Sequence, residues 1–177
     1  AVGNEVRAAH EAAAIFDASP FGKIEVTGPD AEAFLRHVCA GQMARAPGAV
    51  IYTAMLNERG TFESDLTAQR LASDHYRLFV GTNAIVRDLA WLAQHAEGFD
   101  VVLRDSTEDY AVLGLMGPNA ARIAAACGAV GIDDIAYFKH AALVMAGVPI
   151  RAARLSYVGE AGWEITCAAK DASALYA

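Results

Sequence analysis

Apolar residues recur with two different periods along the chain. Spacings of three to four residues predict helices. These helices are expected over residues 4–16, 30–41, 83–96 and 117–128. Alternation, or short apolar runs between turn residues, predicts strands. The strands are expected over residues 23–28, 49–56, 61–71, 75–81, 99–105, 110–117, 141–147, 149–159 and 162–168. Because most strands follow one another through short turns, the pattern favours an α+β fold of antiparallel sheets with packed helices.

The clearest local prediction is a three-stranded meander. Residues 49–56 are apolar on both faces, which suggests a central strand. A turn over residues 57–60 leads into residues 61–71, and Ser73-Asp74 turns the chain into residues 75–81. Short turns of this kind join neighbouring antiparallel strands.

One arrangement occurs twice. A strand, Gly-Pro, Asp or Asn, Ala and then a helix follow one another over residues 26–38 and again over residues 115–127. Proline is favoured in the first turn of a helix, where its missing N–H is not needed. The two copies suggest duplicated αβ units.

We expect three parts along the chain. Residues 1–48 begin a first domain, residues 49–140 form a second α+β domain with the meander, and residues 141–177 return to the first. The last residues, KDASALYA, have the pattern of the first turns of a helix, so we expect a truncated fold from a longer protein.

Composition and charge exclude several functions. The chain has 177 residues, 55% hydrophobic and 20% charged, which is ample material for a core. The net charge of −7 and the scattered arginines argue against nucleic-acid binding. The three cysteines and five histidines lack ligand spacing, so no metal site is expected. No membrane-spanning run or leader is present, which favours a soluble cytoplasmic protein.

Asp65 is the first candidate for chemistry. Alternation places Phe62, Ser64, Leu66 and Ala68 on one face of their strand, and Glu63, Asp65, Thr67 and Gln69 on the other. The second face is either solvated, with Asp65 an ordinary surface acid, or it lines a ligand site. In a site, the carboxylate would take up a proton or stabilise a cation.

The second candidate is the stretch SYVGEAGWEI, residues 156–165. Two glycines flank Glu160, with Tyr157 and Trp163 nearby. The stretch is either a turn with an exposed acid, or it presents Glu160 to an aminopyrimidine edge beside a stacking ring. Tyr137 and Phe138 are expected to pack in the core.

Three motifs together resemble a known family. SPFGKIEVTGPDAEAFL, YTAMLNERGTFESDLTAQRL and LSYVGEAGWEI, in this order, are similar to the folate-binding aminomethyltransferases. This family comprises the glycine-cleavage T-protein and the C-terminal part of dimethylglycine and sarcosine dehydrogenases. The second motif is closer to the dehydrogenase branch, although Thr61 stands where the family usually has glycine.

The resemblance implies a T-protein-like fold, tetrahydrofolate as cofactor, and capture of an amine-derived methylene group to form 5,10-methylenetetrahydrofolate. It implies Asp65 as the catalytic carboxylate, near the reactive folate nitrogens. It further implies contacts to the folate from Tyr52, Asn83, Tyr157 and Glu160. The partners implied are a small amine-derived substrate and a flavin dehydrogenase domain or subunit.

Two other functions remain open at this stage. The same scaffold is compatible with a folate-dependent demethylase that uses another methyl donor. It is also compatible with a folate-binding module that has no catalytic activity. The family's iron–sulfur assembly relatives carry a K-G-C-Y-x-G-Q signature, which this sequence lacks.

Overall fold

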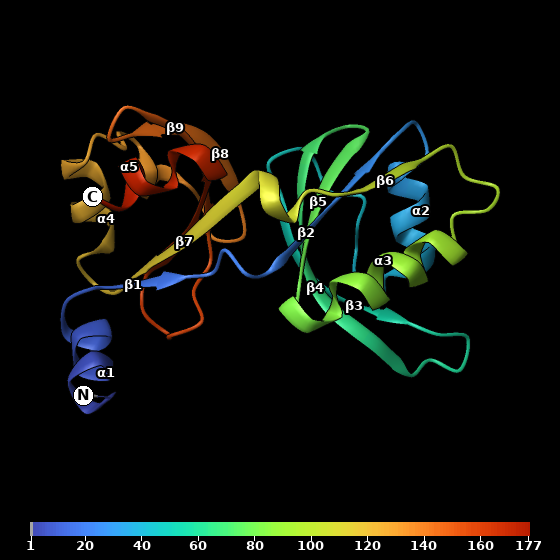
Figure 1. The fold of residues 1–177 in the computed structure, drawn as a ribbon, viewed down its shortest axis with the longest axis horizontal. Coiled ribbons are helices and arrows are strands. Elements are labelled where there is room, and N and C mark those ends of the chain that lie inside the picture. The colour runs from blue at the N-terminus through green and yellow to red at the C-terminus, as the bar shows by residue number, and fades with distance from the viewer. Residues whose placement is uncertain (1) are drawn as a thin grey trace. The chain divides into compact units, whose positions relative to one another are not determined.

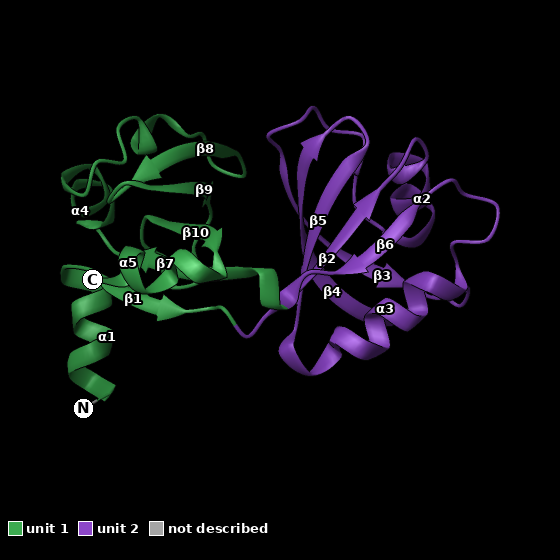
Figure 2. Ribbon diagram, turned by 45° about the horizontal axis from the view of Figure 1, so that its top comes forward, with its two compact units in different colours: residues 1–19, 108–177 green, residues 20–107 purple. Residues whose placement is uncertain are grey.

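The fold is described from a computed structural model, which covers residues 2–177. These residues form two compact units, coloured separately in Figure 2. Of the described residues, unit 1 combines 2–19 with 108–177, and unit 2 is the continuous segment 20–107. Each unit contains one five-stranded antiparallel sheet.

Unit 2 holds the predicted meander. Its sheet has the strand order β3-β4-β5-β2-β6. The elements are β2 (Gly22–Thr27), α2 (Ala31–Val38), β3 (Val50–Leu56), β4 (Phe62–Ala72), β5 (His75–Val80), the 3₁₀-helix η1 (Thr82–Ala84), α3 (Ile85–Gln94) and β6 (Val102–Asp105). A further 3₁₀-helix, η2 (Thr107–Asp109), leads on to unit 1.

Unit 1 has a sheet of order β1-β7-β10-β9-β8. Its elements are α1 (Val2–Glu11), β1 (Ala14–Asp17), β7 (Tyr110–Met116), α4 (Ala120–Ala126), η3 (Ile132–Asp134), β8 (His140–Met145), β9 (Val148–Arg154), β10 (Gly162–Ala168), η4 (Ala169–Asp171) and α5 (Ala172–Tyr176). Their course is shown in Figure 1.

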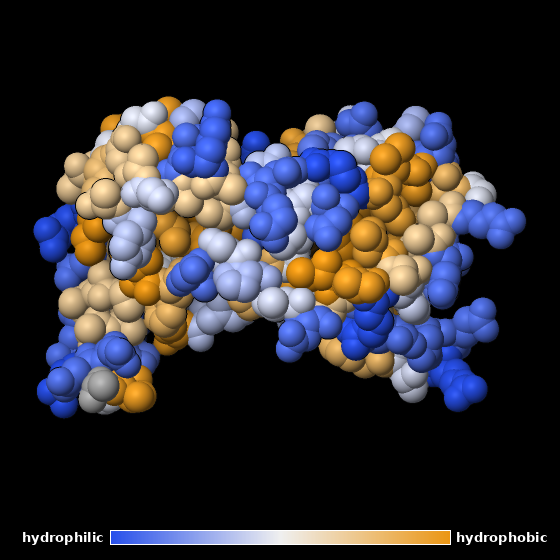
Figure 3. All heavy atoms as spheres, in the orientation of Figure 1, coloured by the Kyte–Doolittle hydropathy of each residue, from blue (hydrophilic) through white to orange (hydrophobic). Residues whose placement is uncertain are grey.

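Helices cover one face of each sheet. In unit 2, Phe34 and Leu35 of α2 and Leu92 of α3 are fully buried against the apolar side chains of the strands. Apolar side chains also gather on the outside where these two helices lie, as Figure 3 shows. In unit 1 the core contains Trp163 and Ile165 of β10 with the small residues of α4. The other face of each sheet carries most of the buried polar residues.

The two units share one topology. In each, a strand, a Gly-Pro turn and a helix precede three meander strands and a 3₁₀-helix that continues into an α-helix (β2 to α3 and β7 to α5). In each, the first strand pairs with the last meander strand. The turn glycines Gly28 and Gly117 both have positive φ, and a Cβ at either would collide with backbone atoms. The repeated motif seen in the sequence is therefore a structural repeat.

Two predicted elements differ from the structure. The helix expected over residues 4–16 ends at Glu11, and residues 14–17 form β1, because they pair with β7 at the edge of the unit 1 sheet. The strand expected to be central, β3, lies at the edge of its sheet. Its apolar residues Ile51 and Met55 face the core, and Tyr52 on the other face is 60% exposed.

The unit borders lie at other positions than the expected 48/49 and 140/141. Pairing of β2 with β5 and packing of α2 on the meander bring residues 20–48 into unit 2. Pairing of β7 with β1 and β10 brings residues 108–140 into unit 1. Both pairings join strands distant in sequence.

Arg70, which is 8% exposed, provides a test of this packing. Its guanidinium donates to Glu32 and to the carbonyls of Arg45, Ala72 and Ser73. We expect Arg70→Met to lower the free energy of unfolding by about 2–4 kcal/mol, because these acceptors lose a buried partner. Urea unfolding measures the change. Arg59→Met, at an exposed turn position, is the control and should change stability by less than about 0.5 kcal/mol. Equal effects of the two substitutions would contradict this role for Arg70.

Candidate functional site

Tyr52 and Asp65 form a hydrogen-bonded pair on unit 2. Tyr52 pairs with Thr67 and Ala54 pairs with Asp65 in the β3–β4 ladder, so both side chains leave the sheet on the same face. The Tyr52 hydroxyl donates to Asp65 Oδ2 at 2.8 Å. Both residues are exposed, on the face opposite the core. The hydrogen bond therefore orients the Asp65 carboxylate at the exposed face of the sheet.

Side chains on the other face hold this end of β4 in place. Ser64, next to Asp65, donates to Asp88 Oδ2 of α3 at 2.6 Å, and both residues are buried. Arg87 donates to the second Asp88 oxygen. In the preceding turn, Asn57 donates to Glu63 and Thr61. The hydrogen bonds of Glu63 and Ser64 thus hold the backbone of β4 next to Asp65.

The other three predicted folate contacts lie elsewhere in the chain. Asn83 is an exposed residue of η1 in unit 2. Tyr157 and Glu160 belong to the segment between β9 and β10 in unit 1, where Tyr157 is 69% exposed. The structure thus brings Tyr52 together with Asp65, and it places Tyr157 and Glu160 in the other unit.

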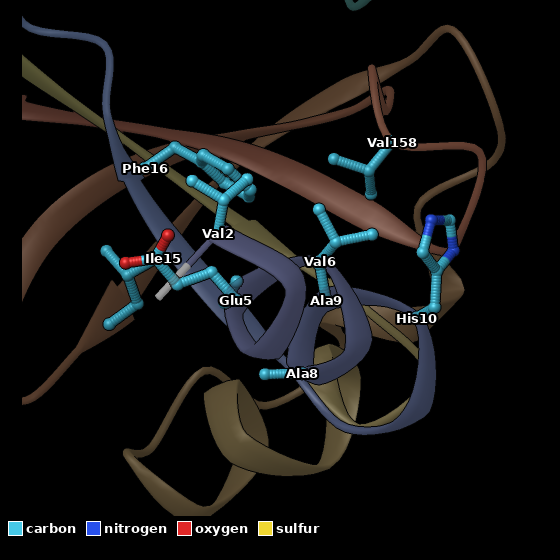
Figure 4. Close-up of a pocket in the computed structure, with 10 residues that line it drawn as sticks. Val2, Glu5, Val6, Ala8, Ala9, His10, Ile15, Phe16 and Val158 are labelled. Carbon is cyan, nitrogen blue, oxygen red and sulfur yellow. The ribbon is translucent and has the colours of Figure 1, made fainter.

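Glu160 lies beside an apolar hollow of unit 1. Its Oε1 is 3.0 Å from His10 Nδ1, and both side chains are more than one-third exposed. His10 lines a cavity of about 620 Å³ between α1, β1 and Val158. Figure 4 shows Val6 and Val158 pointing toward each other there. Glu160 already has a partner at the surface, so its carboxylate is only partly available to a ligand.

Tyr137 and Phe138, expected in the core, are exposed. Their side chains are 58% and 39% accessible, and the rings meet edge to face at 4.8 Å between centroids. Phe138 has φ of 56°, an uncommon conformation for a bulky residue. The expectation of core packing was wrong, because the chain turns at this point before it enters β8.

The structure adds a candidate that sequence reasoning missed, Glu164. It lies on β10 between Trp163 and Ile165, whose side chains enter the core, so Glu164 points to the opposite face. It is 8% exposed. Burial raises the pKa of its carboxyl to about 7. A buried acid of this kind is a candidate for ligand binding, because burial without a counter-charge is costly.

The repeat explains why Glu164 is unusual. The equivalent position in unit 2 is Arg77, which pairs across strands with Glu25, whereas Glu164 pairs across with Gly114. Arg77 Nε donates to Glu25 at 2.6 Å, and His75 and Ser106 also bond to Glu25. Burial raises the pKa of Glu25, but the Arg77 charge and these hydrogen bonds outweigh it and hold the pKa below its ordinary value.

The residues directly opposite Glu164 on its neighbouring strands carry no charge. Opposite it are Gly114 on β7 and Ala153 on β9. In unit 2 the same two places are filled by Glu25 and Gln69. Unit 1 thus keeps a buried acid and has small residues where unit 2 has Gln69 and Glu25, of which Glu25 bonds to Arg77. Aligning the two Gly-Pro motifs in the sequence matches Gly114 with Glu25. This difference between the two copies is the sequence signal that could have pointed to Glu164.

Two further features bear on the type of site. Within residues 2–177, no three His, Cys, Asp or Glu side chains are grouped so as to hold a metal ion. None of the helices described in that range combines the length and apolarity needed to cross a bilayer.

Comparison with known proteins shows the family. The profile of the GCVT N-terminal domain matches residues 1–177. An aminomethyltransferase of Anoxybacillus flavithermus is 36% identical over 98% of this chain and 49% of its own length. The mitochondrial dimethylglycine dehydrogenase of Rattus norvegicus is 31% identical over 99% of this chain and 21% of its own length. The chain therefore spans about half or less of these relatives.

Solved structures agree with this fold. The glycine cleavage system aminomethyltransferase T from Bartonella henselae superposes with a TM-score of 0.87 at 29% identity, over 98% of this chain and 46% of that one. The heterotetrameric sarcosine oxidase from Corynebacterium sp. U-96 superposes with a TM-score of 0.70 at 15% identity, over 98% and 86%. The second likeness concerns the fold alone. This chain belongs to the GCVT N-terminal domain family, as the three motifs predicted.

The buried carboxyl of Glu164 predicts a pH dependence of stability. Its pKa is about 7 in the folded protein and 4.5 ordinarily, so between these values the unfolded chain loses a proton that the folded protein keeps. The free energy of unfolding should therefore fall as the pH rises from 4.5 to 7, by on the order of 3 kcal/mol, and then level off. Urea unfolding of wild type and Glu164→Gln across this range isolates the effect. Parallel curves for the two proteins would refute it.

Proposed function

We propose that this chain is the tetrahydrofolate-binding part of a one-carbon transferase, which captures an amine-derived methylene group as 5,10-methylenetetrahydrofolate. The observation that carries the proposal is the exposed Tyr52–Asp65 pair, which occurs in a member of an aminomethyltransferase-containing family. Bound tetrahydrofolate would supply the nucleophilic nitrogen that accepts the one-carbon unit.

Asp65 would serve as the proton acceptor. One carboxylate oxygen, Oδ2, accepts the hydrogen bond from the Tyr52 hydroxyl, and the other, Oδ1, would accept from a ligand N–H. A nitrogen that forms a C–N bond must lose its proton, and a carboxylate within hydrogen-bond reach accepts it. The same negative charge stabilises a cationic iminium donor as it approaches. Tyr52 holds the carboxylate in orientation, while Ser64 and Asp88 fix the strand beneath it.

Glu164 would bind the aminopyrimidine edge of the pterin. The edge carries adjacent N–H donors, which match the two oxygens of a carboxylate. The burial of Glu164 and its small neighbours Gly114 and Ala153 support this role. Glu160, the residue implied by the resemblance, stays a candidate, although it is already bonded to His10. Asn83 and Tyr157 are exposed and remain proposed folate contacts.

Amine oxidation would come from a flavin dehydrogenase domain or subunit. This proposal rests on likeness to a dimethylglycine dehydrogenase by sequence and to a sarcosine oxidase by fold. The small substrate would then be the amine-derived methylene that such an enzyme releases.

Asp65→Asn tests catalysis. It should keep the affinity for 5-formyltetrahydrofolate within about threefold and lower methylene transfer at least about 100-fold, because the amide accepts no proton. Calorimetric titration and a transfer assay in the protein that contains this chain measure the two effects. Asp74→Asn, at an exposed turn position, is the matched control. Unchanged transfer in Asp65→Asn would favour a binding module without catalysis, and would overturn the assignment.

Glu164→Gln and Glu160→Gln identify the acid that contacts the pterin. We expect Glu164→Gln to weaken 5-formyltetrahydrofolate binding at least about tenfold, because a charged hydrogen-bonding pair is lost, and Glu160→Gln to change it less than about threefold. Titration calorimetry of the three proteins measures the affinities. The reverse order would return the role to Glu160. Absence of binding in the wild type would refute the folate proposal itself.

A further inference from the structure

Thr166 is a buried hydroxyl without a partner. It lies two residues after Glu164 on β10 and is 3% exposed. Within the described residues, its Oγ1 is inaccessible to solvent and makes no hydrogen bond. An unbonded buried hydroxyl destabilises a protein, so a polar group of this kind calls for a functional explanation.

Thr166 shares its face with Glu164. The core of unit 1 takes the alternate residues Trp163, Ile165 and Cys167, so the side chains of Glu164 and Thr166 both point away from it. Neighbouring positions on one strand face are about 7 Å apart, since each residue advances the strand by about 3.3 Å. The two polar groups thus lie within the width of one fused-ring ligand.

The neighbours of Glu164 are small or mobile, whereas Thr166 lies opposite Val112 on β7 and Arg151 on β9. Gly114 and Ala153 flank Glu164 on the adjoining strands. The side chain of Met116 lies so close to Gly114 and Gly162 that a Cβ added to either glycine would crowd it. Methionine has three rotatable bonds and adapts readily to a change in its surroundings. Met116 can therefore move away from Glu164 without a change in the backbone.

We propose that Thr166 is a specificity-determining residue, whose hydroxyl binds the ring carbonyl next to the N–H groups that Glu164 binds. This inference rests on the proposed folate function. A 2-amino-4-oxopyrimidine edge presents an amino group, a ring N–H and a carbonyl in a row. A carboxylate accepts the first two, and a hydroxyl donates to the third. Glu164 and Thr166 supply this acceptor and donor from one strand.

Thr166→Val removes the hydroxyl while keeping the shape of the side chain. We expect the affinity for 5-formyltetrahydrofolate to fall about tenfold, because one hydrogen bond to the ligand is lost. The melting temperature without ligand should rise by about 2–4 °C, because an unbonded buried hydroxyl is removed. Thr166→Ser keeps the hydroxyl and should retain the affinity of the wild type.

Thr53→Val is the matched control. Thr53 is also buried in a strand, but its hydroxyl accepts from the Gly41 N–H and donates to the Ala54 carbonyl. This substitution should lower the melting temperature and leave the affinity unchanged. The opposite signs at two buried threonines distinguish an unused hydroxyl from a structural one.

The outcomes separate the two proposals. If the wild type binds, Glu164→Gln weakens binding and Thr166→Val binds like the wild type, the role of Thr166 is refuted while the folate function stands. If Thr166→Val and Thr166→Ser lose affinity equally, the hydroxyl is not the recognised group and the role is again refuted. If the wild type shows no binding, both proposals fall together.

Discussion

The alternation of side chains along paired strands is the constraint on which both units depend. Once the register of β4 against β3 and β5 is set, Leu66 and Ala68 must enter the core and Asp65 must leave it. A shift by one residue would bury the acid and expose the apolar side chains. The bond from Ser64 to Asp88 secures that register from the core side. Core packing and the placement of the acid therefore have the same cause.

The internal repeat shows how one topology serves two purposes. Arg70 lies over Tyr76 in unit 2 and Arg154 lies over Trp163 in unit 1, both at 5.1 Å from the ring centroid, so the repeat extends to side-chain packing. The chemistry has diverged between the units. Unit 2 carries an exposed acid and neutralises its buried arginine with Glu25, whereas unit 1 carries a buried acid opposite glycine. Unit 2 therefore pairs its buried arginine with an acid, whereas the buried acid of unit 1 has glycine and alanine directly opposite it.

Much of this was predictable from sequence because it is local. The meander, the Gly-Pro turns and the orientation of Asp65 follow from period-two patterns and turn residues. The failures concern distant partners. Residues 14–17 continue an alanine-rich helical pattern and become β1 only through β7. Alternation along β10 predicts that Glu164 points away from the core side of Trp163. Its burial depends on the surrounding structure, and the uncharged residues directly opposite it, Gly114 and Ala153, belong to other strands. The pattern of one strand therefore does not reveal Glu164 as a candidate beside Glu160.

Unit 2 is a continuous segment whose first and last strands, β2 and β6, lie side by side, with Ile24 opposite Asp105. Every strand of its sheet is therefore complete once residue 105 has been synthesised. β1 has no pairing strand at that stage of synthesis, because its partner β7 begins at residue 110. During synthesis from the N-terminus, unit 2 can fold before the strand that pairs with β1 has been made. All strands that pair in the unit 2 sheet thus precede β7, the partner that β1 requires, in the order of synthesis.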